Sequence, residues 1–423
     1  NEESMEKIGK ALGTLMYRRG LGKKAVVGND VRKSGPALSS ALRKGLLATG
    51  IDVLDIGTTS FGLALFSGYN EKCVTAYVTA SHNPPEWNGV KFFEADCIGF
   101  FEKDNKEIGT IVESGEFHKG HGSEKKIDYR GKYADFLKTR FRRGEGLKIV
   151  LDCGNGSTSL VAPEIFRELG FDVVELFCDP HHEFPGRGPD VTEEACKKLG
   201  ETIRRSGASL GIAFDGDGDR MAVVDEKGRF VTTDAIAVAF AKEMLRGKRR
   251  AKIICNIDCS MRMERELEPL GAEIIRIPVG NTFMMQSAKK HSAVFGTESS
   301  QHFVFPSYLP FDDGIVAGLK MAEMVSLSGK PASSFFTDPL PRKTSTIPCP
   351  EQRKQAVMEE IERFSEGYRI DKTDGIRYVF KDGWGLIRPS NTSPAIRITA
   401  ESFSQEATNS IFDEMKRITE DIV

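Results

Sequence analysis

Three stretches of the chain repeat the same order of apolar and polar positions. Each begins with a β-branched run, passes through a polar loop into an amphipathic helix, and reaches a glycine followed by a second β-rich run. The repeats start at residues 24–30 (KAVVGND), 147–156 (LKIVLDCGNG) and 252–258 (KIICNID), and their glycines are Gly50, Gly170 and Gly271. This order is typical of a βαβ unit, and a glycine after a helix suits the left-handed backbone of a C-cap. We therefore expect three similar α/β domains in series, with mixed or parallel sheets covered on both faces.

The pattern changes after Pro341. A helix is expected at about residues 351–364, followed by the strand-like runs GIRYVF, WGLIR and AIRITA and a last helix from about Gln405. This mixture predicts a smaller α+β domain at the C-terminus. The predicted domains are residues 1–130, 131–232, 233–340 and 341–423, and the fold class is α/β.

Composition excludes several classes of protein. The 423 residues are 39% hydrophobic and 28% charged, with a net charge of -2 and well-mixed signs, which favours neither nucleic acid nor a membrane surface as a partner. No apolar run approaches the ~20 residues of a membrane span, and NEESMEKIGK has no signal-peptide core. We expect a cytoplasmic protein.

The 8 cysteines include no C-x-x-C pair, the closest two being Cys255 and Cys259. This spacing indicates neither a zinc cluster nor a disulfide framework. Reduced and mostly buried thiols are expected.

Ser81 lies in the polar stretch TASHNPPEWNGVKFF, residues 79–93, between the strand-like runs 73–79 and 90–93. Pro84 and Pro85 stiffen the turn behind its hydroxyl. A fixed, exposed hydroxyl suits an attacking group, so Ser81 is the candidate nucleophile. The alternative is a surface turn whose serine caps a backbone amide.

The sequence DGDGDR places Asp215, Asp217 and Asp219 at alternate positions between two strand-like runs. Three carboxylates so close repel one another unless a cation lies between them, and oxygen ligands favour a hard ion such as magnesium. An EF-hand is disfavoured because Arg220 occupies the position that requires glycine. An acidic, glycine-rich β-turn is the alternative without a metal.

GNGSTS, beginning at Gly154, follows a strand and opens a helix, with Glu175 about 20 residues further on. This is a weak dinucleotide fingerprint, since Ser159 stands at the place of the third glycine. A plain strand-to-helix turn is the alternative. No G-x-x-x-x-G-K-[ST] loop is present, so ATP is not an evident substrate.

Two further polar loops separate apolar runs: FGTESSQHF at residues 295–303 and RPSNTSPAIR at residues 388–397. In the second, Arg388 offers a planar fork of donors, and Ser390, Asn391 and Thr392 offer short donors in a turn. This combination binds phosphate monoesters, although an arginine beside such a turn can also be surface decoration.

Taken together, TASHNPP, DGDGDR, G-T-E-S-S and RPSNTSP resemble the α-D-phosphohexomutase superfamily over essentially the whole chain, and within it the phosphomannomutase/phosphoglucomutase branch. The resemblance implies an isomerase that interconverts hexose 1-phosphate and hexose 6-phosphate, of glucose, mannose or both. It also implies a phosphoserine, Mg²⁺ and a hexose 1,6-bisphosphate that is both intermediate and primer. The partner would be a small sugar phosphate, and the oligomeric state is open.

Other functions remain open. A phosphoglucosamine mutase is the alternative within the superfamily. A metal-dependent sugar phosphatase would share the serine and the metal loop, and a non-catalytic sugar-phosphate binding protein could keep the phosphate loop.

The resemblance also assigns roles. Ser81 would be the phosphorylated serine and a metal ligand, with Asp215, Asp217 and Asp219 as the other ligands. His82, Lys91 and Arg220 would be catalytic, with Lys91 as a general acid/base whose pKa is lowered by the Arg220 cation. Glu298 and Ser300 would contact the sugar, and Arg388, Ser390, Asn391 and Thr392 would bind its phosphate.

The chain departs from the family pattern at four places. Thr297 and Gln301 replace glycines of G-G-E-x-S-G-H, and Ser393 stands where glutamate is common. These changes bear on sugar specificity rather than on reaction type. Asn391 favours glucose or mannose, because the phosphoglucosamine branch tends to carry glycine there. A glycine- and arginine-containing motif usually precedes the first helix, and the sequence given begins at Asn1, inside that expected helix.

Overall fold

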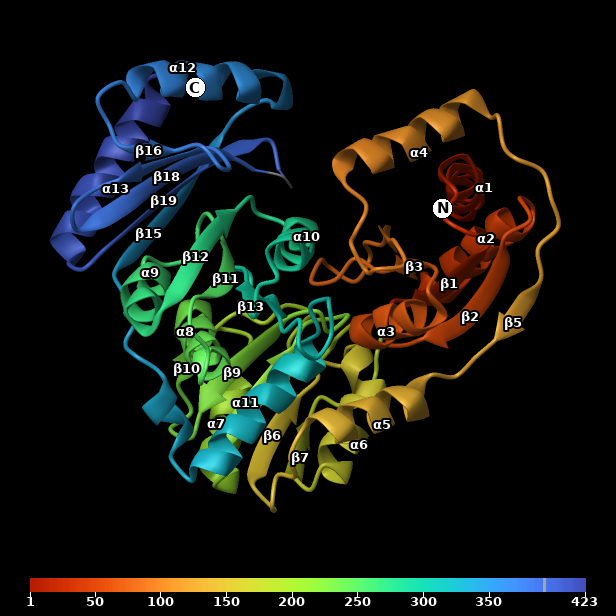
Figure 1. Ribbon diagram of the computed structural model, residues 1–423, viewed down its shortest axis with the longest axis horizontal. Coiled ribbons are helices and arrows are strands. Elements are labelled where there is room, and N and C mark those ends of the chain that lie inside the picture. Colours follow the sequence, from red (N-terminus) through yellow and green to blue (C-terminus); the bar gives the residue numbers. More distant parts are fainter. Residues whose placement is uncertain (391–392) are drawn as a thin grey trace. The chain divides into compact units, whose positions relative to one another are not determined.

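The computed structural model describes residues 1–390 and 393–423. The chain divides into two compact units, residues 1–232 with 300–336 and residues 233–299 with 337–423. Each unit contains two β-sheets (Figure 1).

The first sheet of unit 1 has the strand order β4-β3-β1-β2-β5 and is parallel except for β4. Its strands are β1 (Lys24–Asn29), β2 (Asp52–Thr58), β3 (Val74–Val78), β4 (Val90–Phe93) and β5 (Glu124–Lys126), and its helices are α1 (Glu2–Arg19), α2 (Gly35–Leu47), α3 (Phe61–Glu71) and α4 (Glu102–Ser114). Alternate residues of β1 and β3 face opposite layers. Ala25, Val27 and Ala76 pack in one core with α1, α2 and α4, whereas the Tyr77 ring contacts Phe61 of α3.

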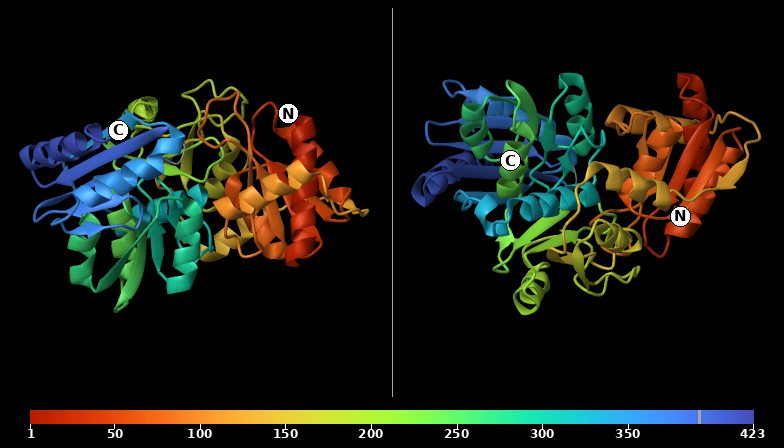
Figure 2. Two further views of the ribbon diagram at one scale, coloured as in Figure 1. Left: turned by 90° about the horizontal axis from the view of Figure 1, so that it is seen from above. Right: turned by 60° about the horizontal axis from the view of Figure 1, so that its bottom comes forward.

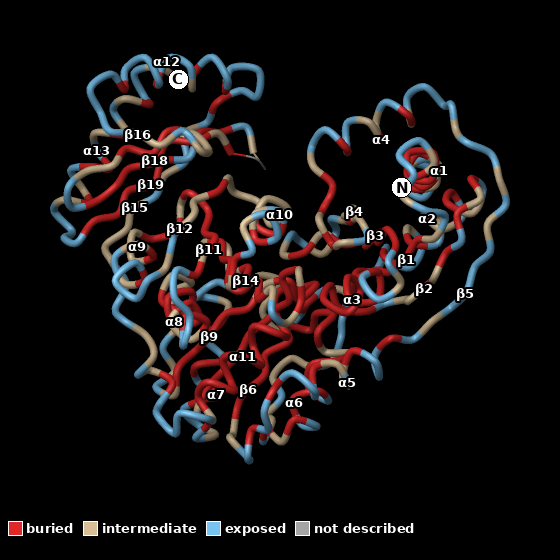
Figure 3. The backbone as a smooth tube through the Cα atoms, in the orientation of Figure 1, coloured by how far each residue is buried: buried red, intermediate tan, exposed pale blue. Residues whose placement is uncertain are grey.

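The second sheet of unit 1 has the order β10-β9-β8-β6-β7. It is built from β6 (Lys148–Asp152), β7 (Asp172–Leu176), β8 (Leu210–Phe214), β9 (Met221–Asp225) and β10 (Phe230–Val231), with α5 (Arg130–Arg140), η1 (Ser157–Leu160), α6 (Ala162–Glu168) and α7 (Lys197–Ser206). β14 (Phe303–Val304), α11 (Gly314–Ser328) and η3 (Ala332–Phe335) complete the unit. α11 is buried from Gly314 to Val325 (Figure 3), which explains why its sequence is mostly apolar; the two charged residues of this stretch, Lys320 and Glu323, pair with each other at 3.0 Å.

Unit 2 begins with strands in the order β12-β11-β13, all parallel. These are β11 (Ala251–Asn256), β12 (Ala272–Ile277) and β13 (Phe295–Thr297), accompanied by α8 (Thr233–Leu245), α9 (Arg262–Leu267), η2 (Glu268–Leu270) and α10 (Asn281–His291).

The last sheet is antiparallel and has the order β15-β19-β18-β17-β16 (Figure 2). It consists of β15 (Arg342–Pro348), β16 (Ile370–Asp371), β17 (Ile376–Val379), β18 (Gly383–Pro389) and β19 (Ala395–Ser402), with η4 (Glu351–Arg353), α12 (Lys354–Phe364) and α13 (Gln405–Glu420). Residues of both helices, such as Ile361 and Met415, pack with Ile387 and Ile398 on one face of the sheet.

The predicted fold class is confirmed: three α/β sheets in series precede a smaller C-terminal domain. Each of the three sequence repeats forms a parallel strand pair, and Gly50, Gly170 and Gly271 have φ of 81°, 85° and 89°. All eight cysteines are free thiols, of which only Cys178 is not fully buried. Within the described residues, no helix is both long and apolar enough to cross a membrane.

Candidate active site

Ser81 lies in the turn between the antiparallel strands β3 and β4. Its backbone is left-handed, with φ of 49°, and its amide donates to Thr79 Oγ1 at 2.9 Å. The residue is only 7% exposed. The expectation of an exposed serine is therefore wrong, and the surrounding loops explain the burial.

Arg32, which follows β1, holds this turn from beneath and is fully buried. Its guanidinium donates to the carbonyl oxygens of Ser81 and Asn83, each at 2.7 Å, and to those of Pro84 and Trp87. It also forms an ion pair with Asp30 at 3.0 Å. One planar cation thus fixes four carbonyls of the loop that carries the candidate nucleophile.

The acidic loop is the hairpin connection between β8 and β9, and its Asp215, Asp217 and Asp219 are buried. Oxygens of the three carboxylates lie within 4.8 Å of one another. Ser81 Oγ donates to Asp215 Oδ2 at 2.8 Å, so two segments 134 residues apart meet at one point. A Cβ on Gly216 would lie 2.6 Å from the Ser81 carbonyl oxygen, which explains why the residue between the first two aspartates is glycine.

The crowding of the carboxylates sets their electrostatics. Burial and the charges of Asp219 and Asp217 raise the pKa of Asp215 well above its ordinary value. Burial acts in the same direction on Asp219, but the charges of Lys91, His302 and Arg220 outweigh it and hold the pKa of Asp219 below its usual range.

Lys91, on β4, lies between two of these carboxylates. Its Nζ is 2.8 Å from Asp219 Oδ2 and 3.2 Å from Asp217 Oδ2. Burial alone would lower the pKa of Lys91, but the two carboxylates outweigh burial and raise it. The predicted lowering by Arg220 is therefore wrong, because the side chains nearest to the ammonium are anions.

His82 and Arg220 flank the same cluster. His82 Nδ1 lies 3.4 Å from Ser81 Oγ, and burial together with the Arg220 charge lowers the pKa of His82. The amide of Arg220 donates to Asp215 Oδ1 at 3.1 Å, and its Nε donates to His302 Nε2 at 3.1 Å.

His302 is held in turn by Asp312. The second nitrogen of the imidazole, Nδ1, lies 2.6 Å from Asp312 Oδ2. Asp219, His302 and Asp312 also form a possible metal-ligand group, but His302 already has a partner at each ring nitrogen.

Four residues at this site were not predicted: Asp30, Arg32, Thr79 and His302. Thr79 Oγ1 lies within hydrogen-bonding distance of both Asp30 Oδ2 and Asp217 Oδ2, at 2.7 and 3.0 Å. Burial raises the pKa of Asp30 to about 6. The available signal was the polar run after β1, because functional side chains gather at the carboxyl ends of parallel strands.

Unit 2 carries Glu298 and the predicted phosphate-binding residues. Glu298, which follows β13, is 2% exposed, and its Oε1 accepts from the Gly280 amide at 2.6 Å. Arg388 is the next-to-last residue of β18, and a terminal nitrogen of its guanidinium lies 3.7 Å from Asp374 Oδ2, which itself accepts from the Val279 amide at 3.0 Å. The consecutive residues Val279 and Gly280 thus help to hold both side chains, Gly280 by donating to Glu298 and Val279 by donating to Asp374, the partner of Arg388.

The remaining predicted residues are placed as follows. Ser390 is buried, and Ser393 Oγ donates to its hydroxyl at 2.8 Å. Ser300 belongs to unit 1 and is half-buried. Asn391 and Thr392 lie outside the described residues.

Two departures from the family pattern can be located. Gln301 has φ of 71°, a backbone conformation that favours the glycine usual at this place, and its side chain donates to the Val191 carbonyl. Thr297 is fully buried at the end of β13.

The weak dinucleotide fingerprint has a structural explanation. Gly154 and its neighbours do form a strand-to-helix turn between β6 and η1, but the guanidinium of Arg187 lies over Gly154. Arg187 forms an ion pair with Asp152 at 2.9 Å, and Glu175 pairs with Arg167. These internal partners favour the plain turn.

In the comparison with known proteins, four family models match successive parts of the chain. Residues 1–119, 131–228 and 232–342 match the descriptions phosphoglucomutase/phosphomannomutase alpha/beta/alpha domains I, II and III, and residues 346–418 match the C-terminal domain. A protein of Thermococcus kodakarensis named "probable phosphoglucosamine mutase" is 36% identical over 97% of this chain and 93% of its own length. Six further relatives share that name.

A second protein of Thermococcus kodakarensis, named phosphoglucomutase/phosphomannomutase, is 34% identical over 95% of this chain and 91% of its own length. Among solved structures, a phosphoglucomutase/phosphomannomutase family protein of Burkholderia thailandensis superposes with a TM-score of 0.92 at 27% identity, covering 100% of this chain and 94% of that one.

Proposed function

We propose that this chain, which belongs to the phosphoglucomutase/phosphomannomutase family and is therefore a phosphohexomutase, interconverts glucosamine 1-phosphate and glucosamine 6-phosphate. The observation that carries the choice of sugar is the similarity, along nearly the whole chain, to relatives named phosphoglucosamine mutase. The sequence led us to expect glucose or mannose phosphate, and these relatives favour the alternative, glucosamine phosphate.

Ser81 is proposed to carry the phosphoryl group between the two ends of the sugar. In the forward step a sugar hydroxyl oxygen bonds to phosphorus as the P–O bond to Ser81 breaks; the hydroxyl gives its proton to a base, and the serine oxygen takes up a proton. Return of the other phosphate from the 1,6-bisphosphate regenerates the phosphoserine. Arg32 fixes the backbone beside Ser81, which keeps the reacting oxygen in one place.

Lys91 and His82 divide the charge and proton chemistry in this proposal. Lys91 lies between Asp217 and Asp219 as a cation, and in that state it stabilises negative charge rather than accepting a proton. His82 is proposed to give a proton to Ser81 Oγ when the P–O bond breaks and to take it back when the serine is rephosphorylated, because its Nδ1 lies 3.4 Å from that oxygen. Arg220 is proposed to contact the phosphoryl oxygens.

The aspartate cluster fits a magnesium ion. Asp217 Oδ1 and Asp219 Oδ1 are buried and have no hydrogen-bond partner among the described residues, although buried carboxylate oxygens normally have one. Asp215, Asp217 and Asp219 would hold the ion together with the phosphate on Ser81. Bound there, magnesium would neutralise the carboxylates and withdraw charge from the phosphoryl group.

Two loops are proposed to select the substrate. Arg388 and Ser390, with Asn391 and Thr392, would bind the phosphate already on the sugar, while Glu298 and Ser300 would contact the sugar hydroxyls. A buried carboxylate such as Glu298 also suits the 2-ammonium group of glucosamine, because the two charges are opposite.

Glucose or mannose phosphate is the second candidate substrate. Asn391 in R-P-S-N-T favours it, and so does the relative named phosphoglucomutase/phosphomannomutase. This chain is 36% identical to the first relative named probable phosphoglucosamine mutase and 34% identical to the one named phosphoglucomutase/phosphomannomutase, so sequence identity alone separates the two candidates only slightly.

The test is a comparison of the 1-phosphates of glucosamine, glucose and mannose, each with magnesium and the corresponding 1,6-bisphosphate, by kcat/KM for formation of the 6-phosphate. We expect glucosamine 1-phosphate to be preferred at least tenfold, which corresponds to about 1.4 kcal/mol in transition-state binding. A tenfold preference for glucose or mannose would reject the proposed sugar and leave the reaction class standing.

A further inference from the structure

Unit 2 contains a pocket of basic character whose lining includes neither Glu298 nor Arg388. Its volume is about 440 Å³. The walls come from α9 and β12 on one side and from β16, β17 and β18 on the other, and they include Arg265, Arg276, Arg369 and Arg377. A volume of this size lies within the range of small-molecule sites.

Arg276 is fully engaged within the protein. Its Nε and one terminal nitrogen donate to the two oxygens of Glu264 at 2.7 and 2.8 Å, and the other terminal nitrogen reaches three backbone carbonyls. The Glu264 carboxylate is thereby committed to Arg276. Neither group is available to a ligand as a free charge.

Arg377 differs in having no comparable partner. It is 7% exposed, and its Nε is buried without a hydrogen-bond partner among the described residues. Its guanidinium carbon lies 4.6 Å from the centre of the Trp384 ring, a contact with the ring face that satisfies no N–H group. Burial and the charge of Arg276 lower the pKa of Arg377 to about 10, so this cation is destabilised where it stands.

The strand register places Arg377 on the pocket side of the sheet. It lies opposite Leu386 on β18, and Trp384 and Leu386 pack against Ile257 rather than against α12 and α13. The guanidinium is therefore on the face turned toward α9 and β12.

The rim adds charge of the same sign. Arg265 and Arg369 are exposed, and among the described residues the only carboxylates in the lining are those of Glu264 and Asp371. Asp371 Oδ1 already accepts from the amide and hydroxyl of Thr373 at 2.9 and 2.6 Å. Four arginines against two carboxylates leave an excess of two positive charges, which matches a dianion better than a monoanion.

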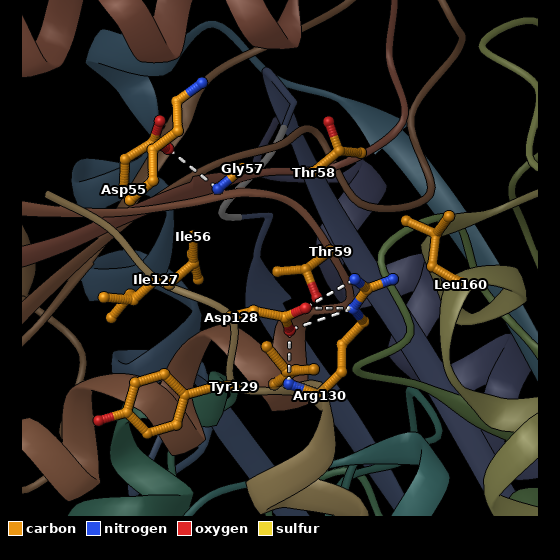
Figure 4. Close-up of a pocket in the computed structure, with 12 residues that line it drawn as sticks. Asp55, Ile56, Gly57, Thr58, Thr59, Ile127, Asp128, Tyr129, Arg130 and Leu160 are labelled. Atoms are coloured by element: carbon orange, nitrogen blue, oxygen red, sulfur yellow. Dashed lines mark hydrogen bonds and ion pairs between the residues drawn. The ribbon is translucent and has the colours of Figure 1, made fainter.

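A pocket in unit 1 serves as a comparison, because the arginine that lines it forms an ion pair with a carboxylate. It has a volume of about 320 Å³ and is lined by Asp55, Lys126 and Arg130, among others. Figure 4 shows the Arg130 guanidinium directed at Asp128, to which it donates from Nε at 3.1 Å. The Arg130 guanidinium is exposed and paired with a carboxylate, whereas that of Arg377 is buried with no ion pair among the described residues.

We propose that the pocket around Arg377 is a binding site for the phosphate group of a small phosphorylated metabolite, separate from the reaction site. The planar guanidinium of Arg377 would donate to two phosphate oxygens, and Arg369 and Arg265 would close over the anion from the rim. Phe380 and Met261 provide an apolar wall for the rest of the ligand. Because the walls belong to both sheets of unit 2, an anion bound there would tie those sheets together.

The protein offers a built-in reporter for this site. It has 2 tryptophans, of which Trp87 is 61% exposed in the Ser81 loop and Trp384 is 1% exposed beneath Arg377. In the full-length Trp87→Phe protein, Trp384 is the only tryptophan. Inorganic phosphate, AMP and sodium acetate would be titrated at constant ionic strength while Trp384 emission is followed.

We expect saturable changes with phosphate and with AMP, and none with acetate at the same concentrations. Adding Arg377→Met should weaken phosphate binding at least tenfold, whereas adding Arg388→Met at the proposed substrate site should change it less than twofold. Should Arg377→Met not fold, the exposed Arg369→Gln decides the question, with an expected weakening of twofold to fivefold. The proposal is overturned by a titration with no saturable phosphate signal, by a signal that Arg388→Met removes, or by one that survives both pocket variants.

Discussion

Arg32→Met tests whether the Ser81 turn depends on a single buried cation. Arg32 makes four hydrogen bonds to the carbonyls of residues 81–87 and one ion pair with Asp30, all with zero exposure of the arginine. Methionine fills much of the same volume but donates no hydrogen bond, so the variant removes the contacts without creating a large cavity.

The expected loss of stability follows from these contacts. Breaking a buried ion pair by removing one partner costs about 3–5 kcal/mol. Here the upper end is limited, because the pKa of Asp30 is already raised to about 6 and its carboxyl can take up a proton once the arginine is gone. The four carbonyls each lose about 1 kcal/mol unless water replaces the donor. The ion pair and the four carbonyls together give an expected loss of about 3–7 kcal/mol, the lower figure applying where water replaces the donor at every carbonyl, and we expect kcat to fall at least a hundredfold.

Urea unfolding and steady-state kinetics measure both effects. Leu12→Ala is the matched control: Leu12 is buried in the core between α1 and the first sheet, and its truncation costs about 3–5 kcal/mol without contact to the Ser81 turn. The control should lose stability and keep kcat. A loss below about 1 kcal/mol in Arg32→Met, or a kcat no lower than that of Leu12→Ala, would refute the role given to Arg32.

Three further predictions concern the metal site, a helix cap and the sugar loop. Asp217→Ala should abolish turnover and should also abolish the rise in Tm that magnesium causes. In EDTA its Tm should be unchanged or higher than that of the wild type, because repulsion between the carboxylates is relieved. A magnesium-dependent rise in Tm equal to that of the wild type would contradict the proposed metal site. Asp313 caps α11, and burial raises its pKa from 3.8 to about 7, so the folded state retains a proton that the unfolded state loses. The contribution of Asp313 to stability should therefore be fully present below about pH 4 and be lost as the pH rises through about 7, and Asp313→Asn should remove this part of the pH dependence; Tm curves of the two proteins that run parallel across this range would count against it. Glu298→Gln keeps an acceptor for the Gly280 amide, so Tm should change little. The variant should lower kcat/KM for glucosamine 1-phosphate tenfold to a hundredfold. An unchanged kcat/KM would show that Glu298 does not contact the sugar.

Much of the fold could be predicted from periodicity alone. The three repeats are local signals: a β-branched run, an amphipathic helix and a glycine with positive φ, and each formed the parallel pair expected, as β11 and β12 illustrate. β15 was not predicted. Its sequence RKTSTIP is mostly polar and ends in proline. The strand lies at the edge of its sheet, where none of its side chains is fully buried and few of them need to be apolar.

The site was predicted less evenly, because its electrostatics depend on segments distant in sequence. Ser81 and the three aspartates do converge. The burial of Ser81 and the raised pKa of Lys91 could not be read from the local sequence, since they arise from Arg32, 49 positions before Ser81, and from Asp217, 126 positions after Lys91. Arg32 itself carries no sign in the sequence that its guanidinium points inward.

The central claim is that phosphate passes from Ser81 to a sugar hydroxyl. The most direct measurement labels Ser81 with ³²P from a hexose 1,6-bisphosphate, removes the excess, and adds unlabelled glucosamine 1-phosphate with magnesium in a rapid-quench experiment. The account predicts that the label leaves the protein and appears in glucosamine phosphates, and that Ser81→Ala takes up no label. Label that is released as inorganic phosphate would indicate a phosphatase, label that remains on the protein would exclude transfer, and either result would contradict the account.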